Sequence, residues 1–149
     1  MRYFDTSFLT PLVLQEATSA KIERFISSLP ADELSISQLA RIEFTSLVAR
    51  EVRMGGLDRK AARAADAQFE TMVQESFVVL LPTAADFDLA KDLLGNHETG
   101  LRAGDALHLA IARNNRSEAI YSLDKTLLSA GRRLGLPVST GIRLAGYGR

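Results

Sequence analysis

Hydrophobic and polar positions along this chain alternate between a helical period and short extended runs. The extended runs lie at residues 2–4, 34–37, 77–81, 119–123 and 136–139. Between them, apolar residues recur at the three- and four-residue spacing of amphipathic helices, over residues 18–29, 38–53, 59–75, 83–94, 101–114 and a short segment after Asp124. This alternation predicts an α/β fold with a mostly parallel sheet of about five strands.

Local signals mark the ends of several predicted elements. Pro30 ends the first helix, and the pair Gly55–Gly56 ends the second. The unbroken apolar run at 77–81 is typical of a strand that is buried on both faces. Pro137 favours an edge position for the last strand, because proline cannot donate to a neighbouring strand. At 149 residues, we expect residues 1–149 to form one domain.

Composition narrows the possible chemistry. Cysteine is absent from the sequence, which excludes a disulfide framework, a thiol nucleophile and a zinc–thiolate site. His97 and His108 are the two histidines, so carboxylates are the expected metal ligands. The sequence has no apolar run of membrane-spanning length and no signal-peptide pattern. We therefore expect a cytoplasmic protein with no membrane partner.

Four acidic residues occupy unusual places in this pattern. Asp5 and Asp124 follow predicted strands, whereas Glu43 and Asp105 lie on or beside apolar faces of predicted helices. Each has a simple structural interpretation, as a helix cap, a pair for an arginine or a favourable charge in a first helical turn. Taken together, they predict a carboxylate cluster beyond the carboxyl ends of the strands, where α/β folds place their functional crevice.

Such a cluster favours binding of a hard cation. Four carboxylates in one cleft repel each other unless a cation or a proton intervenes. Oxygen ligands favour Mg²⁺ or Mn²⁺ over zinc or copper. These ions activate water and neutralise charge on phosphate groups, so the predicted chemistry is metal-assisted hydrolysis of a phosphodiester.

Three segments resemble the motifs of a known family. Residues 2–7 (Arg-Tyr-Phe-Asp-Thr-Ser) resemble the opening strand and first motif of the PIN-domain ribonucleases. Residues 101–110 (Leu-Arg-Ala-Gly-Asp-Ala-Leu-His-Leu-Ala) are similar to their third acidic motif, and residues 121–124 (Tyr-Ser-Leu-Asp) to their fourth. Glu43 matches the second acid. The short chain is most similar to the VapC toxins of toxin–antitoxin pairs.

The resemblance implies a three-layer α/β/α sandwich and an Mg²⁺- or Mn²⁺-dependent endoribonuclease. It assigns metal binding and catalysis to four acids, Asp5, Glu43, Asp105 and Asp124. It implies that three hydroxyl residues support them, namely Thr6, Ser7 and Ser122. It also implies an RNA substrate, a cognate antitoxin protein and a homodimer.

Basic residues are unevenly distributed, although the net charge is zero. Residues 125–149 carry five basic and no acidic side chains. Contact with RNA phosphates, or simply a solvated surface, would explain four basic residues near the acidic motifs: Arg102, Lys125, Arg132 and Arg133. His108 follows Asp105 by one helical turn, and it either reaches the cleft or forms hydrogen bonds within the core.

Two alternatives from other functional classes remain. A PIN-like module that binds RNA or protein without cleaving it would have the same fold, although such modules often lack one of the four acids. A phosphoacceptor domain would need a second acid beside Asp5 and a lysine after the last strand, and residues 134–142 contain no lysine.

Overall fold

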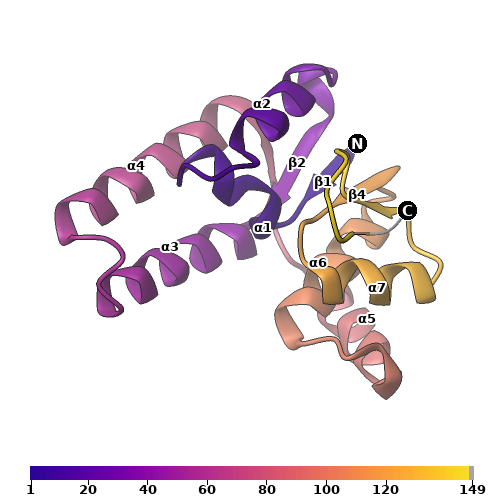
Figure 1. Cartoon of the computed structure of the whole chain (residues 1–149). Coiled ribbons are helices and arrows are strands. Elements are labelled where there is room, and N and C mark those ends of the chain that lie inside the picture. The colour runs from indigo at the N-terminus through magenta and orange to yellow at the C-terminus, as the bar shows by residue number, and fades with distance from the viewer. Residues whose placement is uncertain (148–149) are drawn as a thin grey trace.

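Five parallel strands form the centre of the protein, as seen in a computed structural model that describes residues 1–147 (Figure 1). The strands are β1 (Arg2–Phe4), β2 (Leu34–Ser37), β3 (Val78–Leu80), β4 (Ala119–Tyr121) and β5 (Val138–Ser139). Their order in the sheet is β3-β2-β1-β4-β5, and every neighbouring pair is parallel. The first strand is therefore central, between β2 and β4. Arg149, which belongs to the basic C-terminal segment, lies outside the described residues.

Seven α-helices connect and cover the strands within residues 1–147. They are α1 (Thr6–Leu9), α2 (Ser19–Ser27), α3 (Gln38–Arg53), α4 (Arg59–Ser76), α5 (Ala84–Leu94), α6 (Ala103–Asn114) and α7 (Lys125–Arg133). Three short 3₁₀ turns lie at Thr10–Leu12, Ala31–Glu33 and His97–Thr99. Each predicted helix is present with its ends shifted by at most two residues, whereas α1 and the 3₁₀ turns were not predicted.

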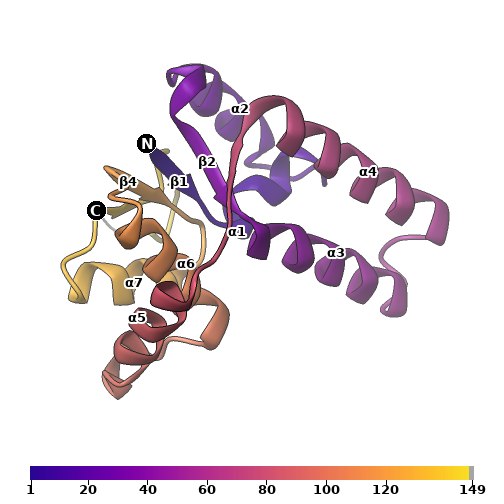
Figure 2. The ribbon, with the colours of Figure 1, turned by 180° about the vertical axis from the view of Figure 1, so that it is seen from behind.

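The two faces of the sheet bury separate cores, because successive side chains of a strand point to opposite faces. Phe4 and Ile36 belong to the core packed under α1, α2, α3 and α4. Tyr3 and Ile120 belong to the core formed with α5, α6 and α7. Figure 2 shows the two groups of helices on opposite sides of the strands. The three-layer sandwich expected from the sequence is thus confirmed.

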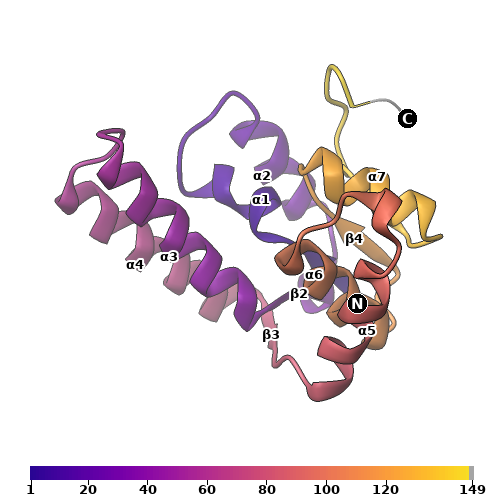
Figure 3. The ribbon, with the colours of Figure 1, turned by 90° about the horizontal axis from the view of Figure 1, so that it is seen from below.

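Helices α3 and α4 form a long antiparallel hairpin that extends away from the sheet (Figure 3). The Phe44 and Phe69 rings stack across it with their centroids 4.1 Å apart and an interplanar angle of 6°. Both rings are fully buried, so this aromatic pair fixes how the two helices pack.

Strand β3 corrects one prediction. The apolar run at 77–81 was expected to be buried on both faces, yet β3 lies at the edge of the sheet. Val78 is 49% exposed and Leu81, just after the strand, is 68% exposed. The prediction of an edge position for the last strand is confirmed by β5. Among the described residues, no helix is long and apolar enough to cross a membrane.

Candidate functional site

The four predicted acids line a single cleft at the carboxyl edge of the sheet. Asp5 directly follows β1, Asp124 follows β4, Glu43 lies in the second turn of the helix after β2, and Asp105 lies in the first turn of α6. The cleft has a volume of about 390 Å³. Its lining consists of Asp5, Thr6, Ser7, Thr10, Glu43, Leu47, Arg50, Asp105, His108 and Asp124. Parallel strands that end at one edge bring these distant segments together.

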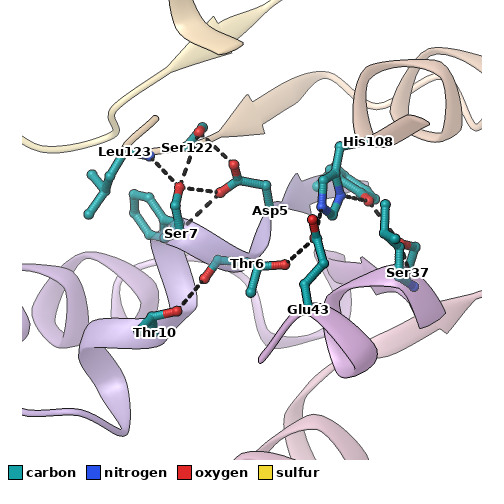
Figure 4. A network of polar contacts seen from close by, with 12 residues as sticks. Asp5, Thr6, Ser7, Thr10, Ser37, Glu43, His108, Ser122 and Leu123 are labelled. Carbon is teal, nitrogen blue, oxygen red and sulfur yellow. Dashed lines mark hydrogen bonds and ion pairs between the residues drawn. The ribbon is translucent and has the colours of Figure 1, made fainter. Parts of the chain in front are cut away.

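Asp5 is the most buried of the four acids, at 3% exposure, and its carboxylate is held by three donors (Figure 4). The Ser7 hydroxyl and the Phe8 amide donate to Oδ1 at 2.8 and 3.1 Å, and the Ser122 hydroxyl donates to Oδ2 at 2.6 Å. Burial raises the pKa of Asp5, although the charge of His108 and these hydrogen bonds oppose that rise. The backbone contact also caps α1, as the alternative structural interpretation anticipated.

Ser122 links the first acid to the fourth. Its hydroxyl donates to Asp5 and also accepts the amide hydrogen of Asp124 at 3.0 Å. The Asp124 carboxylate caps α7, because its Oδ1 accepts the Leu127 amide hydrogen at 3.0 Å. Asp124 therefore combines a structural role with a place in the cleft, and its other oxygen accepts no hydrogen bond from the described residues.

Glu43 is bound to the protein through one oxygen. Its Oε1 accepts hydrogen bonds from the Thr6 hydroxyl at 2.6 Å and from His108 Nε2 at 2.5 Å (Figure 4). Burial opposes ionisation of Glu43, but its hydrogen bond to His108, the charge of His108 and the Thr6 hydroxyl together lower its pKa. The carboxylate is therefore ionised and fixed in direction.

His108 fulfils both interpretations left open by the sequence. It is 2% exposed and lies within the core, where its Nδ1 is 2.6 Å from the Tyr3 hydroxyl, while its Nε2 reaches the cleft at Glu43. Burial alone would lower the pKa of His108, yet the hydrogen bond and charge of Glu43, with the charges of Asp5 and Asp105, raise it. In its protonated form, His108 offsets part of the acidic charge of the cleft.

Asp105 carries the clearest sign of charge crowding. Its pKa is raised to about 6 by burial and by the negative charges of Asp124, Asp5 and Glu43, against the opposing charge of His108. No described residue donates a hydrogen bond to its carboxylate. The neighbouring Gly104 permits a close approach, because a Cβ there would lie 3.0 Å from Glu43 Oε2.

The donor set fits a hard divalent cation in its chemistry. Three aspartates and one glutamate supply oxygen ligands, and the carboxylates of Asp105 and Asp124 retain unused acceptor capacity. Within residues 1–147, however, no three His, Asp or Glu side chains converge closely enough to enclose an ion as they stand. Binding a cation would therefore require the less constrained carboxylates to turn inward.

The four basic residues predicted to contact RNA occupy different surroundings. Arg102 is exposed at the residue before α6, and Lys125 is exposed at the first position of α7, with its Nζ 5.0 Å from the centre of the Tyr147 ring. Arg132 and Arg133 lie in the last turn of α7, where Arg133 pairs with Glu98 at 2.8 Å. None of the four lines the cleft.

Three residues of the cleft were missed by the sequence analysis, namely Thr10, Leu47 and Arg50. Arg50 lies on α3 seven residues after Glu43, which places both on the same face of the helix. The helical spacing from Glu43 was a signal that could have identified it. Arg50 is the basic residue among the side chains that line the cleft, apart from His108.

Comparisons with known proteins agree with this architecture. The model of the PIN domain family matches residues 2–132. The toxin VapC20 of Mycobacterium tuberculosis, which cleaves the sarcin-ricin loop, is 25% identical and has a TM-score of 0.70 over 88% of this chain and 95% of its own. FitAcB of Neisseria gonorrhoeae is 16% identical, with a TM-score of 0.70 over 97% of this chain and 100% of its own.

A third solved structure is VapBC2 of Rickettsia felis, bound to a DNA fragment from its promoter. It is 11% identical, with a TM-score of 0.66 over 93% of this chain and 98% of its own. A comparison with curated protein sequences finds no match. Because the family match covers most of the chain, this protein belongs to the PIN domain family.

Proposed function

We propose that this protein is a metal-dependent endoribonuclease that hydrolyses RNA phosphodiester bonds and acts as the toxin of a toxin–antitoxin pair. The supporting observation is the cleft lined by four carboxylates in a chain of the PIN domain family. The raised pKa of Asp105 supports it further, because burial and nearby negative charges both raise it, and a cation would offset those charges.

In this proposal Asp5, Glu43, Asp105 and Asp124 hold Mg²⁺ or Mn²⁺ and form the catalytic site. The ion supplies positive charge that stabilises the phosphate during displacement. Ser7 and Ser122 keep the Asp5 carboxylate in place, and Thr6 does the same for Glu43. These residues reduce the reorganisation that substrate binding would otherwise demand.

The proposed partners follow from the solved relatives. VapC20 cleaves an RNA loop, and a related structure from Klebsiella pneumoniae is a toxin–antitoxin complex. We infer an RNA substrate, a cognate antitoxin protein and a homodimer that acts in the cytoplasm. Arg102, Lys125 and Arg132 are exposed and available to RNA phosphates, whereas Arg133 would first have to leave Glu98.

A PIN-like module that binds RNA or protein without cleaving it is the alternative. The presence of all four acids in one cleft favours the enzyme. Cleavage itself distinguishes the two functions.

The decisive experiment incubates the purified protein, free of any co-expressed partner, with total RNA and Mn²⁺ or Mg²⁺. Asp124→Asn is the test variant, because asparagine still caps a helix and should preserve α7. Asp88→Asn, which removes an exposed carboxylate on α5, is the matched control. The proposal expects discrete cuts by the wild type and the control, and none with EDTA or with Asp124→Asn. Equal cutting by all proteins would reveal a contaminating nuclease, and RNA binding without cutting would favour the alternative.

A further inference from the structure

Four basic residues follow the α3–α4 hairpin outward from the cleft to its tip. Arg50 and Arg53 lie in the last turns of α3, and Arg59 and Lys60 are the first two residues of α4. All four are exposed, and we call them the basic arm. Figure 3 shows that the hairpin carries them away from the sheet.

The basic arm begins inside the cleft. Arg50 lines it together with Glu43 and Leu47, at the spacing that places all three on one face of α3. A rise of 1.5 Å per residue puts Arg53 about 15 Å along the helix axis from Glu43. Positive charge therefore starts within the acidic cleft and continues outward along one helix.

These cations have no ionic partner within the described chain. Arg41 pairs with Glu70 and Arg133 with Glu98, whereas no residue of the basic arm forms an ion pair or a side-chain hydrogen bond among residues 1–147. Neither of the two acids beside them in the sequence, Glu51 and Asp58, forms an ion pair among the described residues, and Asp58 accepts the Ala61 amide hydrogen as the cap of α4.

The position of Arg59 and Lys60 is unfavourable for the helix itself. The amino end of a helix carries partial positive charge, which favours acidic side chains and disfavours basic ones. The first turn of α4 contains two basic residues and no acid. The stability of α4 therefore does not explain these two charges, whereas binding of an anionic partner would explain them.

We propose that the basic arm binds the phosphodiester backbone of the RNA strand that occupies the acidic cleft. The proposal rests on the proposed function and adds a binding surface to it. The cleft by itself repels a polyanion, so cations beside it are needed to hold the substrate near the acids. Charges spaced along the hairpin, two on α3 and two at the start of α4, match a strand with a phosphate on every nucleotide, and such contacts carry no sequence preference.

Arg113 provides a control away from the hairpin. It is exposed in the last turn of α6 and forms no ion pair among residues 1–147. A variant at Arg113 removes the same charge from the protein without touching the α3–α4 hairpin.

The test measures affinity for a labelled polyuridylate oligonucleotide in the Asp124→Asn background, which prevents cutting during the measurement. Each lost single-strand phosphate contact lowers the slope of log affinity against log salt by about 0.7, so Arg50→Ala with Arg53→Ala should lower it by about 1.4. We expect affinity at low salt to fall about tenfold. Arg113→Ala should leave both quantities unchanged.

A second variant separates binding from folding. Arg59→Ala with Lys60→Ala should weaken RNA binding while the melting temperature stays the same or rises, because unfavourable charges leave the helix start. If Arg59 and Lys60 had a merely structural role, their loss would lower the RNA affinity and the melting temperature together. In the cleavage-competent protein the loss should fall mainly on KM rather than on kcat.

The outcomes distinguish this proposal from the proposed function. Two double variants test the basic arm, Arg50→Ala with Arg53→Ala and Arg59→Ala with Lys60→Ala. If both keep the wild-type RNA affinity and salt slope, the proposal that the basic arm binds RNA is overturned, even if the wild type cuts RNA. Weakened binding in the arm variants, but not in Arg113→Ala, would support it even if no cleavage is found. Equal loss in the Arg113→Ala control would also overturn it, because the effect would then reflect net charge alone.

Discussion

The Ser122 hydroxyl donates to Asp5 Oδ2 at 2.6 Å while accepting the amide hydrogen of Asp124. Ser122 is fully buried, so nothing replaces these bonds when the hydroxyl is removed. Ser122→Ala should destabilise the protein by about 1–3 kcal/mol, because it leaves a buried carboxylate oxygen short of a donor. It should also reduce cleavage, because Asp5 loses its fixed direction. Urea unfolding and initial cleavage rates measure the two effects. The matched control is Ser129→Ala, an exposed serine on α7, and equal effects of the two variants would contradict the prediction.

The contact between His108 and Glu43 should be strongly coupled. Removing Glu43 leaves the buried His108 without this acceptor, and removing His108 leaves the partly buried Glu43 with the Thr6 hydroxyl as its remaining donor. A double-mutant cycle with His108→Ala and Glu43→Ala should give a coupling free energy of about 1–3 kcal/mol. The same cycle on the more exposed pair Arg41 and Glu70 should give less than about 1 kcal/mol. Similar values for the two pairs would refute the structural importance of the buried contact.

Stability in the absence of metal should fall between pH 5 and pH 8. Asp105 has a folded pKa of about 6, above its ordinary value of 3.8, so the folded protein binds its proton more tightly. The stability that this provides is fully present below pH 3.8 and is lost as the pH rises through about 6. The pKa of His108 is also raised, so its contribution has the same sign. Glu43 has a lowered pKa, and its opposite effect falls below this pH window.

Asp105→Asn isolates the contribution of this carboxylate. A shift of two units corresponds to about 2.7 kcal/mol, and we expect about 1 kcal/mol once screening of the partly exposed group is allowed for. Melting temperatures in EDTA across pH 5–8 provide the measurement. The slope should flatten in Asp105→Asn and stay unchanged in Asp88→Asn. A wild-type profile that rises towards pH 8 would contradict the assigned sign.

Divalent metal should raise the melting temperature of the folded protein. A ligand that binds only the native state stabilises it by about 2.7 kcal/mol at one hundred times its dissociation constant. The shift with Mn²⁺ should disappear in Asp105→Asn and Asp124→Asn and persist in Asp88→Asn. No shift at millimolar Mn²⁺ in the wild type would argue against the acids as a metal site.

The sequence predicted most of the fold because its helix starts are chemically explicit. Asp58 and Asp124 cap the helices that follow them, and Asp86 accepts the Thr83 amide hydrogen at the start of α5. The burial of β3 was not predictable from its composition. The same apolar run is compatible with a central strand and with an edge strand. In the structure β3 is an edge strand, and its Val78 is half exposed.

The four acids of the candidate site were predictable from the sequence, but their contacts were not. Two acids after strands and two on helices had to meet once the sheet was parallel, and all four do line one cleft. The sequence could not show that Glu43 Oε1 accepts hydrogen bonds from both Thr6 and His108, because these residues come from three separate segments. Helix α1 was missed because its four residues are too few to show a helical period, although Asp5 caps them.

The pairing of β1 with β4 also sets when the cleft comes into existence during synthesis. The Asp5 amide donates to the Tyr121 carbonyl, so the first acid reaches its final surroundings only after β4 has joined the sheet. A chain still growing on the ribosome lacks both this pairing and the fourth acid until residue 124 has been added. Under the proposed function, the four acids therefore cannot act together on RNA before residue 124 has been added.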